Sequence, residues 1–370
     1  MEEAEICGVK FQALSNEFDS SKLRLLDTAC ANCGVIFGAV PATTMRNDTI
    51  LVLVSTAEPA EAQLAMLKQK LAGVTIIFGN SAEVFEGAAA DASVLFNWSA
   101  PLALFKEVFA MCPNLLWVHS RSVGLERTLF PELKESTVPL TNGAGVFSAS
   151  LGEFAIGAIL YFAKDFRRMI RNQMVGVWEA FDVSWASGQT VGIIGYGDIG
   201  RAIAERARAL GMTVLAVRRH ATTLQGADPL VAQIYAPERR LEMISRCDYV
   251  VVAAPLTSET RGMIGEAEFA AMKPTAVVIN VGRGPVINEE AMVRALSSGR
   301  IRGAALDVFD HEPLPAGHSF YKLENVLLSP HCADHTPDWL DNAMKFFIEQ
   351  YERFRKGEAL LNVVDKKLGY

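Results

Sequence analysis

The stretch Val191–Gly200, which reads V-G-I-I-G-Y-G-D-I-G, decides the fold. Its first residues are apolar and predict a short buried strand. Gly195, Gly197 and Gly200 then complete the pattern G-x-G-x-x-G. In a loop of this kind the first glycine permits a tight turn and the second lets a pyrophosphate approach the backbone. The third lets helix and strand pack closely.

A helix is predicted directly after the glycine loop, because apolar residues recur there at helical spacing. These residues are Ile199, Ala202, Ile203, Ala207 and Leu210. The start of this helix, at Asp198 and Ile199, offers free backbone N–H groups and the positive end of the helix dipole to phosphates. A strand before the glycines and a helix after them predict a dinucleotide-binding site rather than a structural glycine turn.

Composition and charge place the chain among ordinary globular proteins. Its 370 residues suffice for two or three domains, and 50% of them are hydrophobic while 21% are charged. The net charge of -7 argues against a nucleic-acid binder. The longest apolar run, 154–163, is too short to span a membrane, and the acidic start lacks a secretory pattern. Six scattered cysteines indicate a reducing compartment, so we expect a cytoplasmic protein, with an organelle still open.

The first part of the chain holds an extension and then a regular α/β pattern. Residues 1–48 read as an N-terminal extension of unknown role. Its Cys30 and Cys33 have no second pair to complete a zinc site, so we expect no metal. From residue 50 onward strands alternate with helices, which predicts parallel βαβ units. The expected strands span 50–54, 74–78, 93–96, 115–119 and 138–140, and the expected helices span 58–71 and 102–111.

Two segments follow these strands. The loop Ser122-Val123-Gly124 comes after the strand at 115–119, and loops at the carboxyl ends of open α/β sheets bind ligands. We therefore expect it to contact a substrate, with a plain surface turn as the alternative. A long helix is predicted from about residue 150. The segment after it, up to residue 187, is aromatic and lacks periodicity, so we expect a connector that crosses between domains or reaches a partner subunit.

The second half of the chain predicts a further parallel sheet, because its strands are apolar almost throughout. The expected strands span 212–217, 248–254, 276–281, 303–308 and 326–328, and helices are expected at 266–272, after a cap at Asn288, and from Thr336-Pro337-Asp338. Arg218, Arg219 and His220 stand at the end of the second strand. A carboxylate there would bind the ribose hydroxyls of NAD, whereas guanidinium groups bind a 2′-phosphate. The arginines therefore favour NADP(H), with NAD(H) possible if both are merely solvated.

Three ionisable residues, Arg283, Glu312 and His331, follow other strands of this sheet. Because the carboxyl ends of parallel strands face the cofactor crevice, all three could converge on one substrate. A histidine suits proton transfer to a carbonyl oxygen, and a neighbouring carboxylate favours its protonated form. An arginine binds a substrate carboxylate. Taken singly, each could also be an ordinary loop or turn residue.

The stretches around these residues resemble the D-isomer-specific 2-hydroxyacid dehydrogenase family, which includes glyoxylate/hydroxypyruvate reductases and phosphoglycerate dehydrogenases. They are V-G-I-I-G-Y-G-D-I-G-R, A-A-P-L-T-S-E-T-R-G-M-I, N-V-G-R-G-P-V-I-N-E-E-A, A-L-D-V-F-D-H-E-P-L-P and L-S-P-H, and they cover most of residues 190–332. The resemblance implies an α/β fold of two doubly wound parallel-sheet domains with a cleft between them. A flavodoxin-like substrate domain would span 49–147 and 335–370, and a Rossmann NAD(P)-binding domain 148–334.

The resemblance also implies roles for individual residues. His331 would be the acid/base, Glu312 its partner, and Arg283 the clamp on the substrate carboxylate. Asp307 would lie near the nicotinamide carboxamide, and backbone N–H groups of the loop 122–124 would hold the carboxylate. Further cofactor contacts are expected at neighbouring strand ends, from Pro255, Thr257 and Val281.

The favoured activity is reduction of a small 2-oxoacid, glyoxylate or hydroxypyruvate, to the D-2-hydroxyacid with hydride from NADPH. The resemblance adds a homodimer with contacts from residues 178–185. The alternative is a nicotinamide-binding interaction protein that resembles the corepressors built on this scaffold, because these can retain the three residues. Formate dehydrogenase is disfavoured, since that relative carries glutamine where this chain has Glu312.

The chain departs from the family pattern directly after His331. The family more often has small apolar residues and glycine there, whereas this chain has Cys332, Ala333, Asp334 and His335.

Overall fold

The computed structural model describes residues 4–6, 9–11, 48–57, 60–126, 128–219 and 228–370. The chain divides into two compact units, Met1–Gly38 and Ala39–Tyr370. In the first unit β1 (Ala4–Ile6) pairs antiparallel with β2 (Val9–Phe11). The cysteines of the N-terminal extension, Cys30 and Cys33, lie outside the described residues, as does His220.

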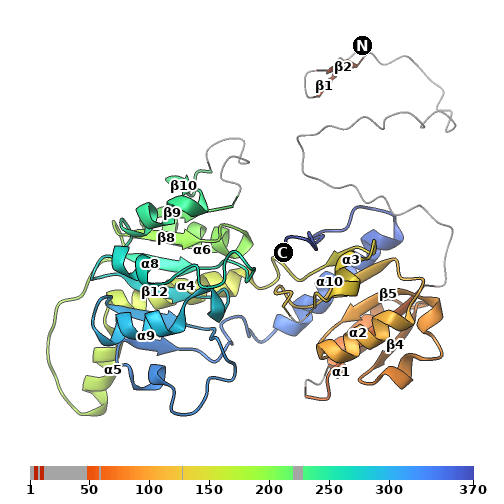
Figure 1. Cartoon of the computed structure of the whole chain (residues 1–370), viewed down its shortest axis with the longest axis horizontal. Helices are drawn as coiled ribbons and strands as arrows, with labels where there is room; N and C mark the ends of the chain where they lie inside the picture. The colour runs from red at the N-terminus through yellow and green to blue at the C-terminus, as the bar shows by residue number, and fades with distance from the viewer. Residues whose placement is uncertain (1–3, 7–8, 12–47, 58–59, 127, 220–227) are drawn as a thin grey trace. The chain divides into compact units, whose positions relative to one another are not determined.

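The larger sheet of the second unit carries the glycine loop (Figure 1). Its order is β10-β9-β8-β11-β12-β13-β14, and all neighbouring strands run parallel. The strands are β8 (Thr190–Ile194), β9 (Thr213–Val217), β10 (Gln233–Tyr235), β11 (Tyr249–Val252), β12 (Val277–Asn280), β13 (Gly303–Leu306) and β14 (Val326–Leu328). The helices with them are α4 (Ser148–Ala163), α6 (Asp198–Ala209), α7 (Arg240–Ile244), α8 (Glu266–Ala271) and α9 (Glu289–Ser297). The chain steps first to one side of β8 and then to the other, which is the doubly wound Rossmann order.

The smaller sheet has the order β4-β3-β5-β6-β7 and is also parallel. Its strands are β3 (Thr49–Leu53), β4 (Thr75–Gly79), β5 (Ala92–Asn97), β6 (Trp117–Ser120) and β7 (Leu140–Thr141). The helices with it are α1 (Glu61–Lys70), α2 (Leu102–Met111), α3 (Pro131–Glu135) and α10 (Trp339–Arg355). This is the flavodoxin-like order. The predicted fold class, α/β with two doubly wound parallel-sheet domains, is confirmed.

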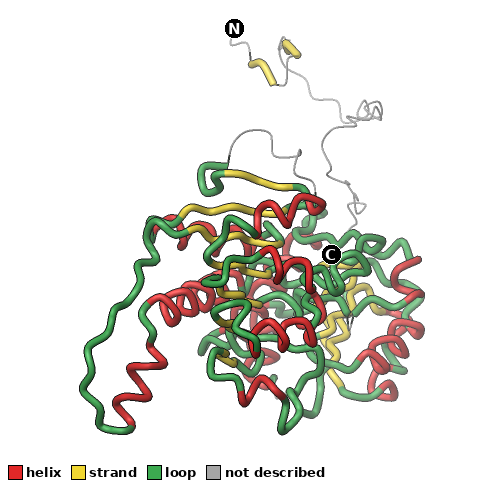
Figure 2. The backbone as a smooth tube through the Cα atoms, turned by 60° about the vertical axis from the view of Figure 1, so that its left-hand side comes forward, coloured by secondary structure: helices red, strands yellow, loops and turns green. Residues whose placement is uncertain are grey.

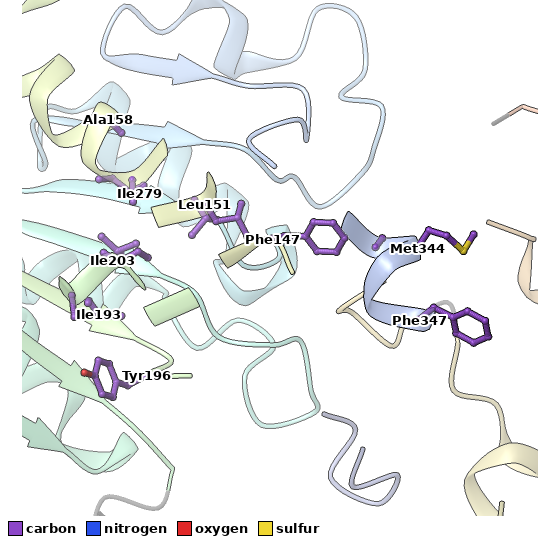
Figure 3. Close-up of a cluster of buried hydrophobic side chains, with 14 of the residues drawn as sticks. Phe147, Leu151, Ala158, Ile193, Tyr196, Ile203, Ile279, Met344 and Phe347 are labelled. Atoms are coloured by element: carbon purple, nitrogen blue, oxygen red, sulfur yellow. The ribbon is translucent and has the colours of Figure 1, made fainter. Parts of the chain in front are cut away.

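Buried side chains fix the helices to the two sheets (Figure 3). Ile193 of β8 and Ile203 of α6 are fully buried, so the helix after the glycine loop is held on its strand. On the smaller sheet, Phe347 of α10 stacks on Phe96 of β5 with ring centroids 4.0 Å apart. The Tyr351 hydroxyl of α10 donates a hydrogen bond to the carboxylate of Asp48, just before β3, at 3.0 Å. Helix α10 therefore packs on the smaller sheet although it follows the larger one in sequence.

The segment 164–187 differs from the expectation in two respects, whereas its expected contact with a partner subunit stays a prediction. Helix α5 (Phe166–Met174) occupies its first part, capped by Asp165, whose carboxylate accepts a hydrogen bond from the Arg168 N–H. The segment also starts from α4 and ends at β8, which both belong to the larger sheet, so it does not cross between the sheets. Figure 2 shows α5 and the loop after it standing away from the other elements.

Smaller differences concern short elements and helix starts. Strand β10 and helix α7 are too short for periodicity to reveal. The last helix begins at Trp339 with Asp338 as its cap, so Pro337 precedes the helix instead of opening it. Asn288 caps α9 as predicted, accepting a hydrogen bond from the Ala291 N–H at 2.9 Å. Short 3-10 helices lie at Ala82–Phe85, Ala89–Asp91, Pro237–Arg239, Gly284–Val286 and Ser319–Lys322. Of the helices in the described ranges, none is long and apolar enough to cross a membrane.

Candidate active site

The glycine loop has the geometry that a dinucleotide requires. Gly195 adopts a φ of +97°, and a Cβ there would lie 2.6 Å from Cα of Ala254 after β11. A Cβ on Gly200 would collide with the carbonyl oxygen of Gly195, so this glycine permits the close approach of α6. A Cβ on Gly197, in contrast, would meet no atom of the described residues within 4 Å. The second glycine therefore leaves its backbone open to a ligand, as a pyrophosphate needs.

The residues predicted to hold the rest of the cofactor line neighbouring strand ends. Arg218 and Arg219 follow β9 directly. Arg219 forms an ion pair with Glu259 and donates a hydrogen bond to the hydroxyl of Tyr370 at 2.7 Å. In the loop after β11, Thr260 binds both predicted residues: its hydroxyl donates to the Pro255 carbonyl at 2.6 Å and accepts from the Thr257 N–H at 2.8 Å. Val281 is buried directly after β12.

His331 and Glu312 form a direct pair. His331 Nδ1 lies 2.7 Å from Glu312 Oε2, and the other carboxylate oxygen accepts a hydrogen bond from the Phe309 N–H at 2.9 Å. The hydrogen bond with Glu312 raises the pKa of His331, although burial opposes this. Burial acts to raise the pKa of Glu312, but the hydrogen bonds from His331 and Phe309 outweigh it and leave that pKa lowered. The pair is therefore tuned to hold a proton on the imidazole.

Asp307 orders the turn that carries His331. Its carboxylate is buried, and Oδ1 accepts hydrogen bonds from the Ser329 hydroxyl at 2.5 Å, the Cys332 N–H at 3.0 Å and the Ala333 N–H at 3.1 Å. Within this turn His331 has a φ of +53°, in the left-handed region. Such a backbone costs a residue with a side chain about 1–2 kcal/mol. The three hydrogen bonds to Asp307 offset that cost and fix the direction of the imidazole.

Arg283 meets the predicted substrate loop. Its Nε donates a hydrogen bond to Glu126 at 3.1 Å, and a Cβ on Gly124 would overlap its Nη2. The loop itself is braced by the next glycine-rich turn, because the Asn142 amide donates to the Val123 carbonyl at 2.9 Å and the Gly143 N–H donates to the Ser122 carbonyl at 3.5 Å. The Arg283 charge also acts against protonation of both His331 and Glu312. The structure thus brings Arg283, the histidine pair and the loop 122–124 to one place.

The residues after His331 include two further titratable groups, Asp334 and His335. Burial raises the pKa of Asp334, and the nearby His335 and His331 act in the opposite direction. The His335 ring stacks on Trp339 with ring centroids 4.2 Å apart. Asp334 and Trp339 also line a cavity of about 200 Å³ at the start of α4. His335 therefore packs on the start of α10, and Asp334 lines the cavity near enough to His331 for the imidazole to act on its pKa.

Sequence reasoning missed three residues of the site: Glu126, Glu259 and Tyr370. Each contacts a predicted arginine, but Glu126 and Tyr370 lie in segments without a distinctive motif, and Glu259 lies in a quoted family stretch without a role that the sequence indicates. Glu126 stands two residues beyond the predicted loop and could have been included as a charge next to it. The sequence contains no signal for the contact between Tyr370 and Arg219.

The fold and the site define a dinucleotide-binding oxidoreductase with a hydrogen-bonded histidine–glutamate pair at the strand ends of its nucleotide sheet. The sequence model of the D-isomer-specific 2-hydroxyacid dehydrogenase NAD-binding domain matches residues 156–333. Glyoxylate reductase of Korarchaeum cryptofilum is 32% identical over 274 residues, 71% of this chain and 80% of the relative. Glyoxylate/hydroxypyruvate reductase A of Arabidopsis thaliana is 34% identical over 255 residues, 68% of this chain and 79% of the relative.

Solved structures agree with these relatives. A D-isomer-specific 2-hydroxyacid dehydrogenase from Xanthobacter autotrophicus Py2, in complex with NADPH, is 30% identical with a TM-score of 0.76 over 87% of this chain and 99% of that chain. An NADPH-dependent glyoxylate/hydroxypyruvate reductase from Sinorhizobium meliloti, in complex with NADP, is 27% identical with a TM-score of 0.75 over 87% and 100%. The chain belongs to the D-isomer-specific 2-hydroxyacid dehydrogenase family, and it is an NAD(P)-dependent enzyme of that class.

Proposed function

We propose that this enzyme reduces a small 2-oxoacid, with glyoxylate or hydroxypyruvate favoured, to the D-2-hydroxyacid with NADPH. The proposal rests mainly on one observation: the His331–Glu312 pair, Arg283 and the loop 122–124 lie close together. The relatives named glyoxylate reductase and the complexes of relatives with NADPH or NADP support the substrate class and the cofactor. Arg218 and Arg219 support NADPH from the side of this chain.

Different residues of the chain would bind the cofactor, bind the substrate and transfer the proton. NADPH, when bound, supplies the hydride for the substrate carbonyl carbon. The backbone at Gly197 and the start of α6 would hold its pyrophosphate, and the strand-end residues Thr257, Val281 and Asp307 would flank its other parts. Arg283 and the backbone N–H groups of the loop 122–124 would hold the substrate carboxylate, because a guanidinium binds a carboxylate in bidentate fashion.

His331 would deliver the proton. Its Nδ1 faces Glu312, so Nε2 is the nitrogen left to face the forming alkoxide oxygen. The raised pKa of His331 keeps the imidazole protonated further into the neutral range, which reduction requires. Glu312 would keep the ring oriented and stabilise its charged form.

We also propose a homodimer and the domain boundaries given by the family resemblance. Exposed apolar side chains gather on α5 and the loop after it, which stand away from the other elements (Figure 2). Trp178 is fully exposed, and Met174 and Trp185 are about four-fifths exposed. Apolar surface of this extent marks a site of protein association. A second copy of the chain would cover it.

The test is steady-state kinetics of the purified enzyme with NADPH and NADH against glyoxylate, hydroxypyruvate and pyruvate. We expect the highest kcat/KM with NADPH and one of the first two acids. A higher kcat/KM with NADH would contradict the proposed role of Arg218 and Arg219. Failure of every 2-oxoacid to oxidise either cofactor would favour the interaction-protein alternative instead.

A further inference from the structure

Tyr370 contacts Arg219, one of the two arginines that the sequence predicts to bind the cofactor. The Arg219 guanidinium sits over the Tyr370 ring, 5.0 Å from its centroid, and donates a hydrogen bond to the phenol oxygen at 2.7 Å. The same guanidinium forms an ion pair with Glu259, from the loop after β11. Arg219 is only 26% exposed, whereas the Glu259 side chain is 68% exposed. Tyr370 therefore packs against Arg219, whereas the Glu259 carboxylate lies at the surface.

The segment that carries Tyr370 is firmly held on the smaller sheet. Lys366 Nζ donates hydrogen bonds to the carbonyl oxygens of Leu133, Ser136 and Val138, at the end of α3 and before β7. Asp365 closes the last turn, because its carboxylate accepts from the N–H groups of Lys367 and Leu368 and its own N–H donates to the Tyr370 carbonyl. Tyr370 is thus presented to Arg219 by an ordered turn, four residues beyond an anchored lysine.

We propose that Tyr370 is a specificity-determining residue of the nucleotide site, which holds Arg219 for the 2′-phosphate of NADP(H). The inference rests on the proposed use of NADPH. A 2′-phosphate would take the place of the exposed Glu259 carboxylate on the guanidinium, since both are anions and the phosphate carries more charge. Tyr370 offers a hydroxyl to the guanidinium instead of a carboxylate and would remain in place.

The hydrogen-bonding capacity of the two side chains fits this assignment. A guanidinium has five N–H donors, so Arg219 can keep its bond to the phenol while it binds a phosphate. The phenol oxygen accepts from Arg219, which leaves its own O–H hydrogen to donate to a phosphate oxygen. The ring stacked on the guanidinium adds a cation–π contact and limits its motion. NAD(H) has no group at this position and would gain nothing from Tyr370.

Binding of 2′,5′-ADP and 5′-AMP to the cofactor-free enzyme, measured by calorimetry, tests the inference without turnover. We expect the wild-type enzyme to prefer 2′,5′-ADP. Tyr370→Ala should weaken 2′,5′-ADP binding about tenfold and 5′-AMP binding less than about twofold, and Tyr370→Phe should lie between because it keeps the ring contact. Glu259→Gln should strengthen 2′,5′-ADP binding, because a competing carboxylate is lost.

The control is Leu368→Ala, an exposed side chain of the same segment, which should leave both affinities unchanged. Thermal unfolding of each variant verifies that the segment stays folded. If Tyr370→Ala binds 2′,5′-ADP as tightly as the wild type, Tyr370 does not contribute to binding. If the variant binds it more tightly, Tyr370 blocks the phosphate position. Either result contradicts the inference. If the wild-type enzyme does not distinguish the two nucleotides, the proposed use of NADPH fails and the inference fails with it.

Discussion

Replacing Gly124 by alanine tests whether catalysis requires Arg283 to lie against the substrate loop. A Cβ on Gly124 would overlap Nη2 of Arg283 and come within 2.5 Å of a carboxylate oxygen of Glu126. Both atoms are at the ends of flexible side chains, and Gly124 lies outside the left-handed region, so the fold accepts the methyl group while the guanidinium retreats. The retreat must exceed about 1 Å, and misplacement of a substrate-positioning group by about 1 Å costs on the order of 100-fold in rate.

We therefore expect kcat/KM of Gly124→Ala for the favoured 2-oxoacid to fall about 100-fold, or about 2.7 kcal/mol of transition-state stabilisation. NADPH binding, measured by fluorescence, and the unfolding temperature should stay close to those of the wild type. Gly87→Ala is the matched control, because its new Cβ would meet no atom of the described residues within 4 Å. Gly284→Ala is the opposite control, since its Cβ would strike the Phe309 backbone and should destabilise the fold. A kcat/KM for Gly124→Ala within about threefold of the wild type would refute the placement of Arg283.

Two further predictions concern the histidine pair. His331→Ala should lower kcat by about 10²- to 10⁴-fold, the usual contribution of a general acid, while NADPH binding changes little; near-wild-type kcat in a steady-state assay would remove His331 from the mechanism. Glu312→Gln removes the carboxylate that raises the pKa of His331. Because reduction requires the protonated imidazole, the fall of kcat/KM with rising pH should begin at a lower pH in this variant. A pH profile unchanged from that of the wild type would show that Glu312 does not act through the charge of His331.

The features that could be predicted from the sequence rest on local patterns. The glycine loop fixes the position of β8 and α6, because it stands between an apolar strand pattern and a helical pattern and Gly200 lets α6 approach the turn closely. The order of the strands then places His331 and Glu312 at one edge of the sheet, since all carboxyl ends of parallel strands lie there. Their pairing could therefore be anticipated without knowledge of the side-chain positions.

The features that escaped prediction depend on contacts between distant parts of the chain or on unusual burial. Arg283 meets Glu126 across 157 residues, and Arg219 meets Tyr370 across 151 residues. A local sequence pattern spans only a few residues, so it cannot predict contacts between residues this far apart in the chain. Helix α5 escaped because its apolar residues alternate with arginines and stay exposed, so it lacks the buried stripe by which a helix is found.

In the proposed site, the nucleotide sheet alone does not supply every contact. Arg283 and Arg219 both follow strands of that sheet, yet each is held by a residue from elements packed on the smaller sheet. Gly124 and Glu126 hold the first, and Tyr370 holds the second. A fragment restricted to residues 148–334 would keep the glycine loop and the His331–Glu312 pair. It would lose the surface against which both arginines are oriented, so binding measured on such a fragment would underestimate selectivity for the carboxylate and for the 2′-phosphate.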